Sequence, residues 1–203
     1  MVSSTATLSG RPTREAVAGS SRPPRRAGVL LDRDGTIIVD HGYVGSPERV
    51  ELIQGAAGAI RRLNRASVPV AVVTNQAGVA RGYFDIDDVE RVHRRIAAEL
   101  EAEGAGVDCF LFCPYHPDGV VDSFTRHSED RKPRPGLAIA AAMTLNLDLN
   151  ASWVVGDRDE DVELATVIGA RPVRIGERPS TDGVPTFRLL ADAVPFILGH
   201  LEP

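Results

Sequence analysis

Short apolar runs that end in polar residues alternate along this chain with segments whose apolar positions have helical spacing. The runs are typical of buried strands, and the intervening segments are typical of amphipathic helices. We predict strands over residues 28–32, 70–74, 107–112, 152–156 and 171–175, and helices over residues 55–66, 87–103, 135–146, 160–168 and 191–201. Strands that alternate with helices form a mainly parallel sheet covered on both faces.

The length of the chain favours one domain. A chain of 203 residues can bury a single core, and no insertion is long enough to form a large cap domain. The predicted fold class is therefore α/β, with one Rossmann-like three-layer α/β/α domain over residues 28–203. Residues 1–27 are rich in arginine and lack helical periodicity, which predicts a disordered basic leader. An organelle transit peptide is the alternative interpretation of that segment.

Charge is divided unevenly between these two parts. Residues 1–27 contain five arginines and one glutamate, a net charge of +4, and the whole chain carries −5, so residues 28–203 carry −9. An acidic domain argues against nucleic-acid binding. The apolar runs are shorter than the roughly 18–20 residues that cross a bilayer. We therefore expect neither a nucleic acid nor a membrane as a partner.

The two cysteines, Cys109 and Cys113, lie four residues apart on one predicted extended segment. That geometry does not permit a disulfide between them. Reduced cysteines are typical of the cytoplasm, so we expect a cytoplasmic protein. We also expect it to be a monomer.

Polar residues collect at the carboxyl ends of the predicted strands. Asp32 and Asp34 follow the first strand, Thr74 ends the second, and Asp157 follows the fourth. Lys132 lies in the long loop after the third strand. In parallel sheets these ends meet at one edge, where ligands bind near a topological switch point. We therefore expect the five side chains to share one cleft.

These residue types suit phosphoryl transfer from a phosphomonoester. Asp32 is the candidate nucleophile, and Asp34 would first give a proton to the leaving oxygen and then take one from water. Thr74 and Lys132 would hold the phosphoryl oxygens. Mg²⁺ would offset the repulsion between carboxylate and phosphate, with oxygen ligands from Asp32, Asp157 and a backbone carbonyl near Asp34. Taken singly, each residue has a structural alternative, such as capping a turn or ending a strand.

Four segments of the chain resemble the motifs of the haloacid dehalogenase-like phosphohydrolases, in that family's order. They are Asp32-Arg-Asp-Gly-Thr36, Thr74, Lys132 and Gly156-Asp-Arg-Asp-Glu-Asp161. Bacterial receiver domains also combine acids, a threonine and a lysine, but there the paired acids are adjacent and the lysine comes last. The resemblance implies a Mg²⁺-dependent phosphatase that forms an aspartyl-phosphate intermediate.

Other segments are similar to the D-glycero-D-manno-heptose 1,7-bisphosphate phosphatases within that superfamily. The loop Asp-His-Gly-Tyr-Val over residues 40–44 resembles their substrate loop, and the match extends over residues 29–175. The resemblance implies substrate contacts from Asp40, His41, Gly42, Tyr43, Asn75, Gln76, Arg131 and Arg158. Such side chains supply the hydrogen-bond partners that a polyol phosphate needs, and an arginine can grip a second phosphate. The alternative for residues 40–43 is an ordinary turn, with a positive φ angle at Gly42.

The chain departs from this family at a zinc-binding loop. Many relatives bind structural zinc through a Cys-x-His and Cys-x-Cys pattern, whereas the matching positions here hold Cys113, Tyr115, Ser128 and Asp130. Structural zinc normally takes four cysteine or histidine ligands, so we expect none. An improvised set of Cys113, His116, His127 and Asp130 is the alternative.

Three functions follow from these patterns. The favoured one is a phosphatase that releases the 7-phosphate of heptose 1,7-bisphosphate, with a small sugar phosphate as its only partner. The second is a phosphatase for histidinol phosphate or another small phosphomonoester. The third, of a different class, is a binding protein that has lost catalysis. The intact set of Asp32, Asp34, Thr74, Lys132 and Asp157 argues against the third.

Overall fold

A computed structural model describes residues 24–177 and 181–201 of the protein. Its centre is an open sheet in which every neighbouring pair of strands is parallel, in the order β3-β2-β1-β4-β5-β6. The strands are β1 (Val29–Leu31), β2 (Val70–Asn75), β3 (Cys109–Cys113), β4 (Trp153–Gly156), β5 (Arg171–Ile175) and β6 (Thr186–Phe187). The predicted α/β class and parallel sheet are confirmed.

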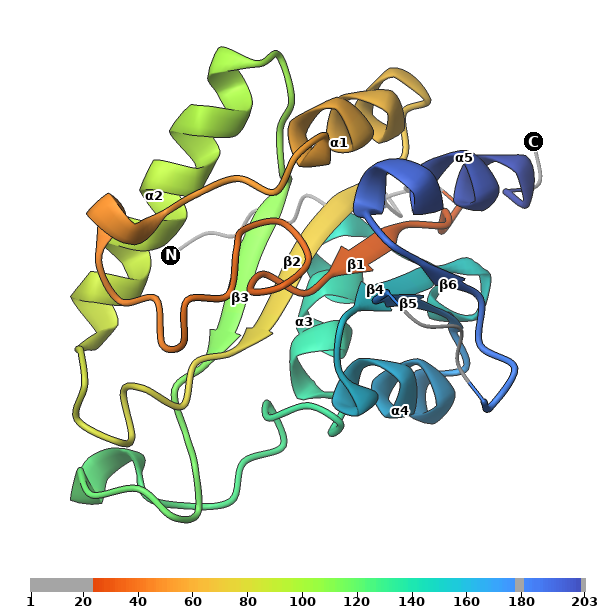
Figure 1. Ribbon diagram of the computed structural model, residues 1–203. Coiled ribbons are helices and arrows are strands. Elements are labelled where there is room, and N and C mark those ends of the chain that lie inside the picture. The colour runs from red at the N-terminus through yellow and green to blue at the C-terminus, as the bar shows by residue number, and fades with distance from the viewer. Residues whose placement is uncertain (1–23, 178–180, 202–203) are drawn as a thin grey trace, which may run out of the picture.

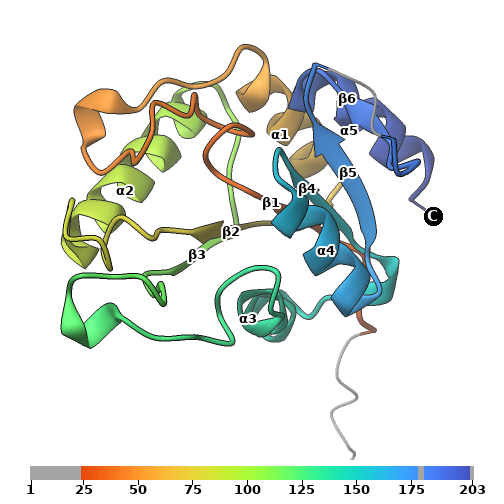
Figure 2. The same cartoon turned by 60° about the horizontal axis from the view of Figure 1, so that its bottom comes forward.

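Helices cover both faces of the sheet, as Figures 1 and 2 show. The helices are α1 (Ala56–Arg65), α2 (Ile86–Ala102), α3 (Gly136–Leu145), α4 (Asp159–Ile168) and α5 (Leu190–Gly199), with short 3-10 turns at Pro47–Arg49, Asp122–Phe124 and Leu149–Ala151. One core lies under α1, α2 and α5, and a second lies under α3 and α4. Alternate residues of β1 divide between them, since Val29 and Leu31 enter the first core and Leu30 the second.

Register brings the reactive strand ends to one level. Leu31 pairs with Val72 on one side and with Val155 on the other, and the backbone N–H of Asp32 donates to the carbonyl of Val155 at 2.8 Å. Asp32 therefore leaves the sheet between β2 and β4. The chain order reverses at this point, which is where α/β sheets bind ligands.

One strand differs from the prediction. The sequence pattern missed β6, because two residues are too few to show any periodicity. Pro172 lies inside β5 and has no backbone N–H to donate to a neighbouring strand. No hydrogen bond is lost there, because β6 pairs only with Arg174 and Ile175. Both cysteines are free, as predicted. Most of the predicted basic leader lies outside the described residues, and within them no helix could span a bilayer.

One ionisable residue of α2, His93, lies in the core. The residue is 7% exposed, and its ring stacks on Phe110 at 4.9 Å and meets Phe112 edge-on at 5.6 Å between ring centroids. Burial, and then the positive charge of Arg33, lower the pKa of His93 to about 3. The folded protein therefore holds His93 neutral at every pH above that value.

The neutral state of His93 predicts that acid weakens the fold between pH 7 and pH 5. The unfolded chain protonates this histidine near pH 6.5, whereas the folded protein does so only near pH 3. Its contribution is complete above pH 6.5 and is lost as the pH falls. From pH 7 to pH 5, the unfolding free energy of His93→Phe should fall by about 2 kcal/mol less than that of wild type. Urea unfolding measures this difference, with the exposed His127→Gln as control; equal losses in wild type and His93→Phe would contradict it.

Candidate active site

A cleft of about 430 Å³ opens at the carboxyl edge of the sheet, beyond β1 and β2. Most predicted site residues line it: Asp32, Asp34, Asp40, Gly42, Tyr43, Thr74, Asn75, Gln76, Arg131, Lys132 and Arg158. Asp157 lies close beside the cleft, because its carboxylate forms one acidic cluster with those of Asp32 and Asp161. His41 does not line the cleft, because its ring contacts Glu51 at 3.1 Å instead.

Lys132 is the buried cation of this cleft. Its side chain is 2% exposed, and its Nζ lies 2.9 Å from Asp32 Oδ1 and 2.6 Å from Asp161 Oδ1. Burial opposes the charge of Lys132, but the two carboxylates outweigh burial and raise its pKa above the ordinary value. The ammonium group therefore stays charged and holds both carboxylates in place.

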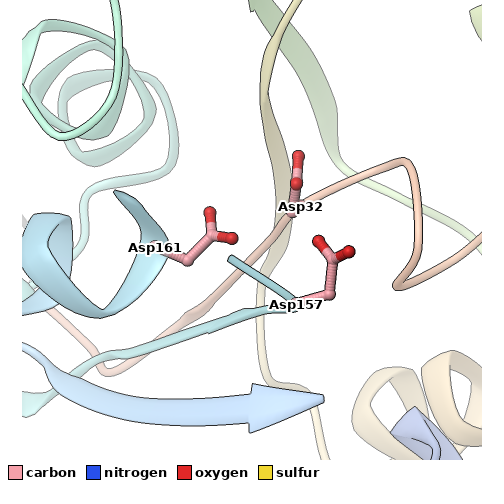
Figure 3. Close-up of side chains that lie close together, drawn as sticks. All are labelled: Asp32, Asp157 and Asp161. Carbon is pink, nitrogen blue, oxygen red and sulfur yellow. The ribbon is translucent and has the colours of Figure 1, made fainter. Parts of the chain in front are cut away.

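Asp32 and Asp161, the two carboxylates that contact this lysine, form an acidic cluster with Asp157 (Figure 3). One oxygen from each of the three lies within 4.8 Å of the others. Burial, followed by the nearby charge of Asp32, raises the pKa of Asp157 to about 6. Burial also raises the pKa of Asp161, although its ion pair with Lys132 opposes the rise. The cluster carries more negative charge than one lysine can offset.

These carboxylates fit a hard divalent cation such as Mg²⁺, because carboxylate oxygens are the ligands that Mg²⁺ prefers. Asp157 Oδ1 is buried and has no hydrogen-bond partner among the described residues, and Asp32 Oδ1 is buried beside the Lys132 ammonium. Asp161 is committed to protein contacts, because its Oδ2 accepts from the backbone N–H of Arg158 at 3.2 Å. Asp32 and Asp157 are therefore the better placed ligands.

Two glycines allow these carboxylates their positions. A Cβ on Gly156 would lie 2.0 Å from Asp161 Oδ2, and a Cβ on Gly35 would lie 2.4 Å from Asp157 Oδ2. Gly35 also has a φ angle of 76°, which favours glycine. Sequence reasoning did not single out Asp161 as a site residue. Its signal was the position four residues after Asp157, one turn into α4.

Asp34 lies apart from the acidic cluster. Its Oδ2 accepts from Arg33 Nε at 3.0 Å and from Gln76 Nε2 at 2.9 Å, and its Oδ1 accepts from Arg33 Nη2 at 3.1 Å. The Asp34 carboxylate therefore belongs to a different hydrogen-bond network from the three clustered carboxylates. The predicted metal contact through a backbone carbonyl near Asp34 stays a prediction. Sequence reasoning overlooked Arg33, which stands between the two aspartates.

Thr74 and Asn75 end β2 beside these groups. Thr74 Oγ1 accepts from Gln76 Nε2 at 3.0 Å. The Asn75 amide makes two bonds to the backbone of Lys132: its Nδ2 donates to the carbonyl at 3.1 Å, and its Oδ1 accepts from the N–H at 3.0 Å. Asn75 therefore fixes the loop that presents Lys132. Its predicted contact with substrate stays a prediction.

The loop over residues 40–44 is a tight turn at the mouth of the cleft. Asp40 Oδ1 accepts from the backbone N–H of Gly42 at 2.8 Å, and Asp40 Oδ2 lies 2.9 Å from Arg158 Nη2. Gly42 and Tyr43 have φ angles of 70° and 52°. The turn that we considered as an alternative is therefore present, yet it carries Asp40, Gly42 and Tyr43 to the cleft.

Three basic residues also line the cleft, Arg81, His116 and Arg131. Arg131 lies 3.6 Å from Glu160. Partial burial, then the charges of Arg131 and Arg81, lower the pKa of His116. Sequence reasoning missed Arg81, and it considered His116 only as a zinc ligand. Neither residue belongs to a recognisable motif, so only their spatial convergence identifies them.

The loop predicted to lack zinc is held by other contacts. The Cys113 thiol lies 3.8 Å from the carbonyl of Tyr115, and Ser128 Oγ accepts from the backbone N–H of Asp130 at 3.1 Å. The guanidinium carbon of Arg126 lies 3.9 Å from the centroid of the Tyr115 ring. Tyr115, one of the four positions that the sequence comparison considered for zinc, is thus held in a cation–π contact.

Comparison with known proteins assigns the family. A family profile described as HAD-hydrolase-like matches residues 130–178. The chain is 45% identical over 146 residues to the D-glycero-beta-D-manno-heptose-1,7-bisphosphate 7-phosphatase of Rhodopseudomonas palustris. The matched region covers 72% of this chain and 81% of that protein. The chain is 40% identical over 158 residues to the protein of the same name from Yersinia pestis, which covers 76% and 84%. The chain belongs to the heptose-bisphosphate 7-phosphatase family.

A solved structure of this family gives a direct comparison. The D,D-heptose 1,7-bisphosphate phosphatase from B. bronchiseptica, complexed with magnesium and phosphate, matches with a TM-score of 0.74 and 30% identity, over 85% of this chain and 98% of that one. The predicted membership of the HAD-like superfamily and of this phosphatase family is confirmed. As a HAD-like phosphatase the chain has the acidic cluster that a Mg²⁺ ion requires.

The contacts of the 113–130 loop predict that the protein folds without structural zinc. Protein purified without added metal should contain less than about half an equivalent of zinc by elemental analysis, because one thiol and scattered histidines do not complete a tetrahedral site. Dialysis against EDTA should leave its melting temperature unchanged. Near-stoichiometric zinc that survives dialysis would contradict this interpretation of Ser128 and Asp130.

Proposed function

We propose that the protein hydrolyses the 7-phosphate of D-glycero-D-manno-heptose 1,7-bisphosphate through an aspartyl-phosphate intermediate. The observation that carries the proposal is the position of Asp32. It stands at the switch point of the sheet, 2.9 Å from a buried lysine and within the acidic cluster, in a chain that belongs to the heptose-bisphosphate phosphatase family. Lys132 thus places positive charge beside the carboxylate that would attack an anionic substrate.

Asp32 would attack the phosphorus atom of the 7-phosphate. Lys132 supplies positive charge where negative charge shifts on the phosphoryl oxygens in the transition state. Thr74 adds a hydroxyl on the neighbouring strand end. Asp32 and Asp157 would hold Mg²⁺, which when bound offsets the repulsion between nucleophile and phosphate.

Asp34 would carry the protons of both steps. In the first step it gives a proton to the departing sugar oxygen, and in the second it takes a proton from the attacking water. Asp34 lines the cleft, and its Oδ1 accepts a hydrogen bond only from Arg33 among the described residues. One face of this carboxylate is thus available to the substrate.

Substrate orientation would come from both walls of the cleft. Arg131 and Arg158 are the candidates for the distal phosphate, and each is now paired with an acid, Glu160 and Asp40 respectively. A substrate phosphate can replace these acids as the partner. Asp40, Gly42, Tyr43 and Gln76 would meet the polyol, while the geometry gives no support to a contact from His41.

The surroundings of the enzyme are part of the proposal. We propose a catalytic domain over residues 28–203 after a basic leader over residues 1–27, and a monomer that acts in the cytoplasm. The free cysteines support a reducing compartment. The charge of −9 on residues 28–203 supports a small phosphorylated substrate, rather than a nucleic acid, as the partner.

A substrate panel tests the proposal. With Mg²⁺, wild type should release one phosphate from heptose 1,7-bisphosphate with a higher kcat/KM than from histidinol phosphate or fructose 1,6-bisphosphate. Asp32→Asn should abolish turnover while leaving the fold intact, because an amide is a poor nucleophile and a weaker metal ligand. Activity of Asp32→Asn within tenfold of wild type would refute the aspartyl-phosphate mechanism. A preference for histidinol phosphate would replace the proposed substrate.

Arg131 and Lys132 should fail differently when changed. Lys132→Ala should lower kcat on every phosphoester by about a hundredfold or more. Arg131→Ala should cost about 2–4 kcal/mol in kcat/KM on heptose bisphosphate and leave a generic aryl phosphate nearly unaffected. The measurement is kcat/KM for both variants on both substrates, with Arg134→Ala, on a half-exposed neighbour paired with Glu129, as control. Equal losses on the two substrates for Arg131→Ala would mean that it serves the reaction centre or the fold.

A further inference from the structure

Arg33 is a charged residue in the interior of the protein. It is 0% exposed, and it is among the largest fully buried side chains. Moving an ionised group out of water costs several kcal/mol unless nearby groups compensate it. A buried guanidinium beside a catalytic cleft therefore needs a reason for its position.

The contacts of Arg33 converge on the Asp34 carboxylate. The Nε and Nη2 atoms of Arg33 donate to the two carboxylate oxygens at 3.0 and 3.1 Å, a fork that fixes the plane of the carboxylate as well as its distance. Arg33 Nη2 also donates to the side-chain oxygen of Gln76 at 2.9 Å, and the amide nitrogen of Gln76 donates to Asp34 Oδ2 at 2.9 Å. Arg33, Gln76 and Asp34 thus form a closed ring of hydrogen bonds.

The same guanidinium reaches the loop at the mouth of the cleft. Arg33 Nη2 donates to the carbonyl of Val44 at 3.0 Å, and Val44 directly follows Tyr43, which lines the cleft. One buried side chain therefore joins the proton-transferring carboxylate to the turn over residues 40–44. Through Gln76 it also reaches Thr74, whose Oγ1 accepts from Gln76 Nε2 at 3.0 Å.

The charges around Arg33 leave Asp34 as its ionic partner. Among the described residues its one ion pair is with Asp34. His93 does not compete as a cation, because burial and the charge of Arg33 keep it neutral. Asp34 is 17% exposed while Arg33 is fully buried, so the pair is oriented with its carboxylate toward the cleft.

We propose that Arg33 is a positioning residue, whose buried guanidinium sets the orientation of the Asp34 carboxylate for proton transfer and couples it to the turn over residues 40–44. The inference rests on the proposed function, since it assigns Asp34 the protons of that reaction. Arg33 itself is fully buried and is not among the residues that line the cleft. Its effect passes through Asp34.

The reaction states what correct orientation must achieve. In the first step an Asp32 oxygen forms a bond to phosphorus, the bond from phosphorus to the sugar oxygen breaks, and the proton of Asp34 moves to that oxygen. In the second step Asp34 takes a proton from water as the water oxygen bonds to phosphorus. The acyl phosphate bond then breaks, which releases inorganic phosphate and restores the Asp32 carboxylate. A poor leaving group depends on the Asp34 proton in the first step, whereas an activated aryl leaving group does not.

Leaving-group dependence therefore tests the proposal. Arg33→Lys keeps the charge but cannot form the fork, so its kcat/KM should fall about a hundredfold or more on phenyl and alkyl phosphates and on heptose bisphosphate. On 2,4-dinitrophenyl phosphate kcat/KM should fall less than about fivefold, because kcat/KM does not include the later hydrolysis of the intermediate. Asp34→Asn should show the same division. Arg95→Lys, on an exposed arginine of α2 paired with Glu99, should match wild type on every substrate.

The possible results separate the two proposals. If wild type hydrolyses aryl phosphates but not heptose bisphosphate, the proposed substrate fails while the role of Arg33 is still tested on the aryl series. An equal loss on good and poor leaving groups for Arg33→Lys would overturn the positioning role. Should Arg33→Lys not fold, Gln76→Met, which breaks the hydrogen-bond ring with little change in volume, takes its place with the same criterion. If neither variant folds, the ring serves the fold and the proposal is overturned.

Discussion

The buried ion pairs of Lys132 are the interactions on which the site depends. One ammonium group contacts Asp32 at the end of β1 and Asp161 on α4, and it stands on the loop between β3 and α3. Without it, two buried carboxylates would face each other uncompensated, and removing one partner of such a network typically costs about 3–5 kcal/mol. The Asn75 amide, which binds the backbone of Lys132 on both sides, adds the end of β2 to the same assembly. Lys132 thereby joins the ends of β1 and β2 to the first turn of α4.

The three clustered carboxylates carry more negative charge than the single Lys132 ammonium offsets, and this excess favours the binding of a divalent cation. Burial, and then the negative charges of Asp32 and Asp161, raise the pKa of Asp157 to about 6 although Arg158 opposes the rise, so the protein alone holds its acids at some cost. A divalent cation removes that cost and at the same time lets an anionic phosphate approach. The guanidinium groups of Arg81 and Arg131 also line the cleft and add positive charge there. The domain can thus be strongly acidic as a whole and still accept a phosphorylated sugar.

Two buried cations divide the work in this cleft. Lys132 contacts Asp32, the proposed nucleophile, whereas Arg33 holds the Asp34 carboxylate and reaches the turn over residues 40–44. The two aspartates, Asp32 and Asp34, stand only one residue apart, yet they belong to different networks. That separation gives each carboxylate its own surroundings, as the proposed roles of nucleophile and proton carrier require.

The sequence by itself determined the α/β class, the parallel sheet and the family. Strands buried on both faces need continuous apolar runs, and the helix from 86 to 102 needs its apolar positions at helical spacing, so local pattern and fold agree there. Asp32, Thr74 and Lys132 were predictable because the chemistry needs those residue types at strand ends. Only the tertiary structure decided the roles of Arg33, Asp161, Arg81 and His116. Arg33 lies between two aspartates and has no periodic pattern that would single it out. Contacts such as that of Lys132 with Asp161 join residues far apart in the chain. Burial and partner, which set the charge and orientation of these groups, exist only once the chain has folded.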